Sequence, residues 1–77
     1  MHMSYYNYHA TIKHLLKTDH CIGASIFKDY HHISPALVFY FDNHHPMPVR
    51  KYKWSEYLPI ITDLKIPLNN VNNLALN

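Results

Sequence analysis

The sequence predicts an α+β domain with the element order α-β-β-β-α, in which two helices pack on one face of a three-stranded antiparallel sheet (a meander). Three observations support this fold class. Apolar residues recur at helical spacing near both ends of the 77-residue chain. Three short stretches between them are rich in β-branched and aromatic residues. Turn-forming residues separate these stretches, and short connections favour antiparallel neighbours.

The first helix is expected over residues 5–19. Ser4 suits the N-cap position, and Gly23, the only glycine in the sequence, suits the exit from the helix. One face of this helix is apolar, through Tyr5, Tyr8, Ile12, Leu15 and Leu16.

Three strands are expected to follow the first helix. The first covers residues 24–30, where side chains of alternating character point to opposite faces. The second, Ala36–Phe41, has the strongest strand signal, and the third covers residues 49–53. Turn formers fill the two connections, residues 31–35 and 42–46.

The central strand is apolar on both faces. Leu37, Phe39 and Phe41 would face the helices, whereas Val38 and Tyr40 would face the other side. Because the two helices cover only one face, we expect the second face to be covered by a partner or by a second copy of the chain.

The second helix begins at Ser55, which caps it, and Glu56 complements the positive helix end. Pro59 falls in the first turn, and Pro67 ends the helix. We therefore expect residues 1–67 to form one small domain and residues 68–77, with five asparagines, to be a flexible C-terminal tail. The apolar stripe of the helix consists of Tyr57, Ile60, Ile61 and Leu64.

Composition narrows the class of protein. A hydrophobic content of 48% and a charged content of 16% argue against disorder, and no apolar stretch is long enough to span a membrane. A chain this short is marginally stable alone, and Cys21 has no second cysteine to pair with. The lone cysteine and the absence of a signal-peptide pattern after Met1 favour the reducing cytoplasm.

The chain is rich in histidine, with eight residues, but their spacing argues against a shared metal site. His9 and His14 are five residues apart, so they lie on diverging faces of a helix. The pairs at 31–32 and 44–45 flank opposite ends of the central strand, roughly 20 Å apart. We therefore expect turn and surface histidines, with no metal and no cofactor. A zinc site between subunits, and catalysis by a histidine beside Asp29 or Asp42, stay open as alternatives.

The third strand offers the best candidate surface. Arg50, Tyr52 and Trp54 would share one face, and Lys51 and Lys53 the other. Arginine and aromatic side chains together suit either a protein interface or RNA. The alternative is that Trp54 packs beneath the second helix and the lysines are solvated.

The order α-β-β-β-α resembles that of double-stranded RNA-binding domains and of HicA-type toxins, which cleave RNA with a histidine. The likeness to the toxins covers residues 12–16, residues 31–33 and the last helix. The sequence departs from the toxins in lacking their Gly-Ser before the histidine and their proline–histidine after the third strand. It also lacks the lysine cluster of double-stranded RNA-binding domains, since Ser55 is followed by Glu56.

These observations predict a protein-interaction module that forms a homodimer and has no catalytic residues, although an enzymatic role is left open. RNA binding or RNA cleavage is the alternative function. The partner would be a second copy or another protein, or RNA in the alternative, and no membrane. The predicted surface consists of Val38, Tyr40, Arg50, Lys51, Tyr52, Lys53 and Trp54.

Overall fold

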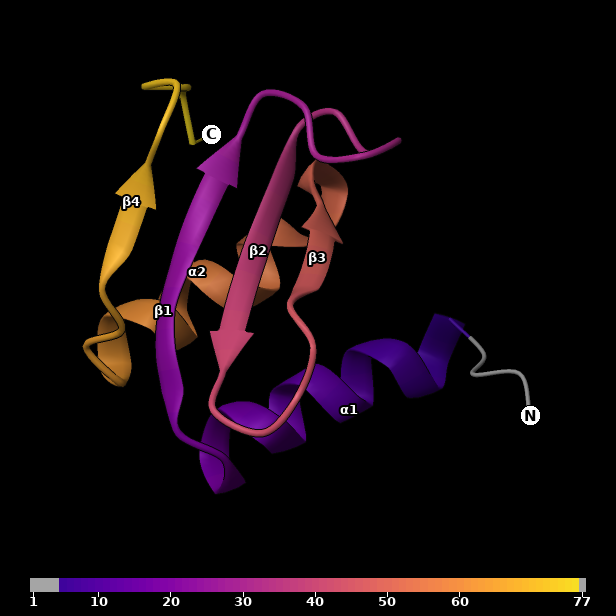
Figure 1. Ribbon diagram of the computed structural model, residues 1–77, viewed down its shortest axis with the longest axis vertical. Coiled ribbons are helices and arrows are strands. Elements are labelled where there is room, and N and C mark those ends of the chain that lie inside the picture. The colour runs from indigo at the N-terminus through magenta and orange to yellow at the C-terminus, as the bar shows by residue number, and fades with distance from the viewer. Residues whose placement is uncertain (1–4, 77) are drawn as a thin grey trace.

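The computed structural model describes residues 5–76, and the side chains of residues 7–76. The predicted N-cap Ser4 and the side chain of Tyr5 lie outside this part. The described chain is an α+β fold with two helices and a four-stranded mixed sheet (Figure 1). Its elements are α1 (Tyr5–Thr18), β1 (Cys21–Phe27), β2 (Ala36–Phe41), β3 (Met47–Arg50), the 3-10 turn η1 (Lys51–Lys53), α2 (Trp54–Asp63) and β4 (Leu68–Asn70).

The sheet has the strand order β3-β2-β1-β4. β1, β2 and β3 form the predicted antiparallel meander, but β4 adds a fourth strand that is parallel to β1. The prediction of a three-stranded, purely antiparallel sheet is therefore wrong. The fourth strand, Leu68–Asn70, comes from the segment expected to be a flexible tail. It pairs because the Ala24 N–H donates to the Pro67 carbonyl at 2.8 Å and the Val71 N–H to the Ile26 carbonyl at 3.1 Å.

β1 begins three residues earlier than expected and ends at Phe27 rather than at Tyr30. Gly23 lies inside this strand instead of at the exit of α1. A Cβ atom at Gly23 would stand 3.3 Å from the Pro67 carbonyl oxygen. The glycine therefore permits the close approach of the chain that leads into β4.

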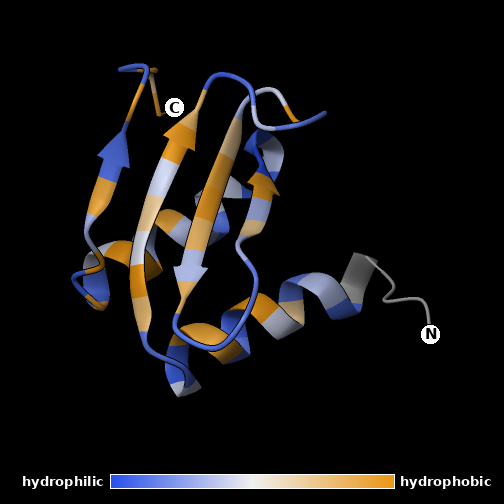
Figure 2. Ribbon diagram, in the orientation of Figure 1, coloured by the Kyte–Doolittle hydropathy of each residue, from blue (hydrophilic) through white to orange (hydrophobic). Residues whose placement is uncertain are grey.

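Both helices pack on one face of the sheet, as predicted, and lie behind it in Figure 1. From β2, the side chains of Leu37, Phe39 and Phe41 enter the core between the sheet and the helices. Figure 2 shows apolar segments in both helices and in the strands in front of them. The helices contribute Ile12, Leu15, Leu16, Trp54, Tyr57 and Ile61 to this core.

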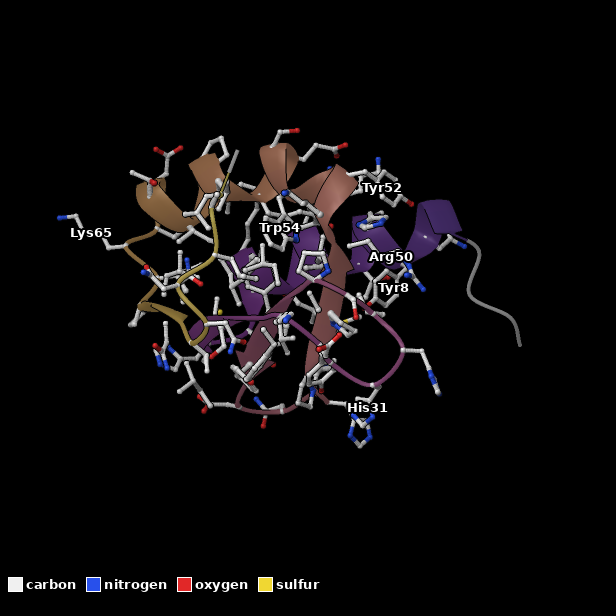
Figure 3. The ribbon with its side chains drawn as sticks, turned by 90° about the horizontal axis from the view of Figure 1, so that it is seen from above. Tyr8, His31, Arg50, Tyr52, Trp54 and Lys65 are labelled. Atoms are coloured by element: carbon white, nitrogen blue, oxygen red, sulfur yellow. The ribbon has the colours of Figure 1, made fainter. Side chains whose placement is uncertain are left out.

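The chain covers the second face of β2 itself. Ala36 and Val38 are both 0% exposed, although neither belongs to the core beneath the helices. Phe27 is the cross-strand neighbour of Ala36, and its ring stacks on Tyr30 with centroids 5.6 Å apart. The ring of His31 packs edge-on against Tyr30, on the side of the sheet away from the helices (Figure 3). A partner is therefore not needed to cover Val38, contrary to the expectation from the sequence.

β3 covers Met47–Arg50 instead of the predicted residues 49–53, so it begins two residues earlier and ends three residues earlier than expected. The next residues, Lys51–Lys53, form a 3-10 turn, and α2 starts at Trp54. Pro48 lies in this edge strand, where it has no N–H to offer a further strand. Its carbonyl accepts a hydrogen bond from the Tyr8 hydroxyl at 2.7 Å, so helix α1 closes this edge.

α2 ends in a Schellman motif. The Ile66 N–H donates to the Ile61 carbonyl at 3.0 Å, and the Lys65 N–H donates to the Thr62 carbonyl at 3.2 Å. Ile61 and Ile66 are both buried in the core, which supplies the apolar contact of this motif. Lys65 is left with φ = 54°, the left-handed conformation that glycine adopts most easily.

Replacing Lys65 with glycine is expected to raise the free energy of unfolding by roughly 0.5–1 kcal/mol, because the strain at positive φ exceeds the extra backbone entropy of glycine. Lys17→Gly is the matched control, since Lys17 lies in the right-handed helix α1 and its replacement should lower stability by roughly 0.5–1 kcal/mol. Urea denaturation measures both changes. Equal destabilisation by the two variants would contradict this account of the helix end.

Candidate functional site

The structure separates the residues of the predicted surface. Arg50, Lys51 and Tyr52 are exposed together where β3 passes into η1. Trp54 is only 1% exposed, and its indole N–H donates to the Val49 carbonyl at 2.9 Å. Trp54 is the first residue of α2, and its side chain is buried in the core between this helix and the sheet, which agrees with the alternative interpretation.

The remaining predicted residues do not join Arg50 and Tyr52. Val38 is buried and offers no surface to a partner. Tyr40 is half-buried and lines a separate hollow over β1 and β4, together with Ser25 and Asn69. Lys53 is half-buried and hydrogen-bonded to Glu56.

A cavity of about 150 Å³ lies beside Arg50 and Tyr52. Tyr8, Arg50 and Tyr52 are seen gathered at one end of the molecule in Figure 3. Four of the lining residues were missed by the sequence analysis, because they come from α1, from the loop after β1 and from the start of β3. The complete lining is Tyr8, His9, Ile33, Pro48, Arg50 and Tyr52.

The inner wall of this cavity is uncharged. Burial, with a smaller effect of Tyr30, raises the pKa of Tyr8 to about 12, so its hydroxyl keeps its proton and donates to Pro48. His9 is 8% exposed, and its Nδ1 lies 2.6 Å from the Tyr57 hydroxyl oxygen. Burial first, and then the charge of Lys53, lower the pKa of His9 below 6.5. The expectation that the histidines are turn and surface residues is therefore wrong for His9.

Two of the nearby lysines are already engaged. The Lys13 ammonium donates to one carboxylate oxygen of Glu56 at 2.6 Å, and the Lys53 ammonium donates to the other at 2.8 Å. These two hydrogen bonds lower the pKa of Glu56 to about 2. Arg50 and Lys51, by contrast, form no ion pair with any described side chain. Arg50 therefore contributes a positive charge to the lining of the cavity, and Lys51 follows it in the chain.

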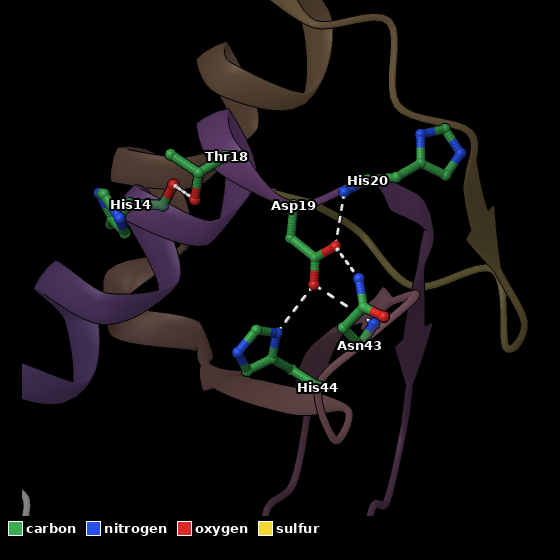
Figure 4. Close-up of polar contacts among 6 residues, drawn as sticks. All are labelled: His14, Thr18, Asp19, His20, Asn43 and His44. Carbon is green, nitrogen blue, oxygen red and sulfur yellow. Dashed lines mark hydrogen bonds and ion pairs between the residues drawn. The ribbon is translucent and has the colours of Figure 1, made fainter.

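A second polar cluster lies around Asp19, at the opposite end of α1 from Tyr8 (Figure 4). Asp19 accepts hydrogen bonds from the His20 N–H at 2.8 Å, from the Asn43 side chain at 3.0 Å and from His44 Nδ1 at 2.8 Å. These bonds, led by that of His44, lower the pKa of Asp19. The cluster fastens the β2–β3 turn to the end of α1, which is a structural role.

No three His, Cys, Asp or Glu side chains in the described part of the chain are close enough to hold one metal ion. His44 reaches Asp19 from the β2–β3 turn, whereas His31 lies in the loop on the far side of the sheet. The structure therefore does not gather the histidines into one site.

A larger hollow, of about 370 Å³, opens beside the start of β1 and the end of α2. Two large apolar side chains are exposed there, Ile22 at 53% and Leu64 at 47%. Burial raises the pKa of the Cys21 thiol in this hollow, so the thiol stays protonated. The full lining is Leu16, Asp19, His20, Cys21, Ile22, Leu64, Lys65, Ile66 and Pro67.

Comparison with protein families, with curated proteins and with solved structures finds no match to this chain. Neither described helix has the length and apolar character needed to cross a membrane. The function must therefore be argued from the surfaces themselves.

The stability of the protein is expected to fall as the pH drops below 6.5, in part because of His9. The folded chain holds His9 neutral, whereas the unfolded chain binds a proton near pH 6.5, so protons favour unfolding until the pH has passed the folded-state pKa. The free energy of unfolding, measured by urea denaturation at several pH values in this range, should depend less steeply on pH for His9→Met than for the natural chain. The other seven histidines are common to both proteins and cancel in the comparison. An NMR titration midpoint of His9 at or above 6.5 would contradict this.

Proposed function

We propose that this chain is a non-enzymatic protein-interaction module that pairs with a second copy of itself through the β4 end of the sheet. The observation that carries the proposal is that Ile22 and Leu64, both about half exposed, line one hollow beside the open edge of β4. The lone Cys21, with its protonated thiol, suits the reducing cytoplasm as the place where it acts.

The exposed apolar side chains favour this end of the molecule. Four large apolar residues of the described chain are exposed, namely Ile22, Tyr52, Leu64 and Val71. Only Tyr52 lies at the β3 end. Ile22 lies at the start of β1 and Leu64 at the end of α2, and both line the hollow, whereas Val71 follows β4 and lies outside it. Exposed apolar side chains around a hollow are typical of an interaction surface.

The two edges of the sheet differ in what they offer a partner. The β3 edge contains Pro48, which has no N–H, and the Pro48 carbonyl already accepts a hydrogen bond from the Tyr8 hydroxyl. β4 pairs with β1 on one side only, so the backbone groups on its outer side face away from the sheet (Figure 1). A strand edge of this kind can accept another strand through main-chain hydrogen bonds.

A second copy is the occupant that fits this surface best. Two copies of β4 can pair antiparallel about a two-fold axis, because a two-fold interface uses the same patch on both subunits. The paired copies would bury Ile22 and Leu64, which are half exposed in the single chain.

Leu64→Asp is expected to weaken self-association by about tenfold or more, because it places a charge in the apolar centre of the interface. Tyr52→Asp is the matched control, since Tyr52 is the exposed apolar residue at the other end of the sheet and should leave the association unchanged. Sedimentation equilibrium of the natural chain at micromolar concentration should show a dimer. A monomer at every accessible concentration, or equal weakening by the two variants, would overturn the proposal.

A further inference from the structure

We propose that the cavity beside Arg50 and the hollow next to it form a binding strip for single-stranded nucleic acid. One base enters the cavity, and the phosphates on either side contact Arg50, Lys51 and Lys28. The strip runs from the β3 edge toward the segment after β4, which contributes Leu74 and Ala75, and it shares no lining residue with the hollow beside the start of β1 and the end of α2. It therefore adds a second function that does not depend on self-association.

The two hollows are lined by residues that are adjacent or close in sequence. Arg50 lines the first, and the next residue, Lys51, lines the second. The loop between β1 and β2 also contributes to both, through Ile33 in the first and Pro35 in the second. The second hollow has a volume of about 320 Å³ and is lined by Lys28, Asp29, Ser34, Pro35, Lys51, Leu74 and Ala75.

The charge along this strip is positive. Lys28, Arg50 and Lys51 form no ion pair with any described side chain, in contrast to Lys13 and Lys53, which share Glu56. Asp29 is the one carboxylate among the residues that line the two hollows, and it accepts a hydrogen bond from the Ser34 hydroxyl. Three unpaired cations in a row match the repeating negative charge of a phosphate backbone.

The aromatic side chains favour a nucleic acid over an acidic peptide. Tyr52 is 66% exposed, and its ring lines the cavity beside the half-buried ring of Tyr8 and the uncharged imidazole of His9. A base can stack on such rings while an adjacent cation holds its phosphate. An acidic side chain would pair with the cations but has no ring to stack on the exposed face of Tyr52.

The size of the cavity favours a single strand. At about 150 Å³ it is smaller than the roughly 300–1,000 Å³ of sites that enclose a whole drug-sized ligand. It therefore admits one planar group at a time. The bases of a duplex are paired and stacked, whereas those of a single strand can turn outward into a cavity.

Fluorescence anisotropy with fluorescein-labelled oligouridine and oligothymidine tests the proposal. With three phosphates neutralised, the logarithm of the binding constant should fall with the logarithm of salt concentration with a slope of about −2. Arg50→Ala should weaken binding and make this slope shallower by about 0.7. Tyr52→Ala should weaken binding by about tenfold and leave the slope unchanged, because stacking releases no counterions. Binding of either oligonucleotide supports the proposal.

Lys17→Ala is the control for a change in total charge, since Lys17 is exposed in the last turn of α1, far along the helix from Tyr8, and should bind like the natural chain. Leu64→Asp should also bind normally, which separates this site from the proposed dimer interface. The proposal is overturned if neither oligonucleotide binds at low salt or if Tyr52→Ala has no effect. Equal displacement by polyglutamate would show a site for acidic protein segments instead.

Discussion

The burial of β2 on both faces is the constraint on which the rest of this structure depends. Leu37 and Phe39 lie against the helices, and Ala36 and Val38 are fully buried on the opposite face. Removing both faces of one strand from water stabilises a small domain, at about 25 cal/mol per Å² of apolar surface. It also requires that protein lies on both sides of the strand. The helices cover one face, and the stacked rings of Phe27 and Tyr30 lie on the opposite side, beside Ala36.

The burial of the second face of β2 limits where a binding surface can form on the sheet. The loop after β1 places Ile33 beside β3, where Tyr8 and Arg50 complete a cavity. Because Ala36 and Val38 are fully buried, the large exposed apolar side chains lie instead toward the two ends of the sheet. They differ in chemistry. The β3 end is basic and aromatic, whereas the β4 end is apolar and has an open strand edge.

Local patterns predicted much of the fold, and long-range contacts account for what they missed. The bounds of β2 and the α+β class follow from residue type and spacing alone. β4 has only three residues and no strand signal. It pairs because Gly23, more than forty positions away, lets the chain approach. Arg50 and Tyr52 were found from their residue types. Tyr8 and His9 were not, because only the packing of α1 brings them to the same cavity.

In the proposed dimer, each chain covers β2 with its own residues and pairs with the second copy through the β4 end. A dilution series of amide ¹H–¹⁵N NMR spectra distinguishes the two surfaces, since each amide reports on its own surroundings. We expect the amides of Ile22, Leu64 and Asn69 to shift on dilution and those of Val38 and Phe27 to stay fixed. Shifts confined to β2 and the loop after β1 would show that a second copy, rather than the chain itself, covers this face.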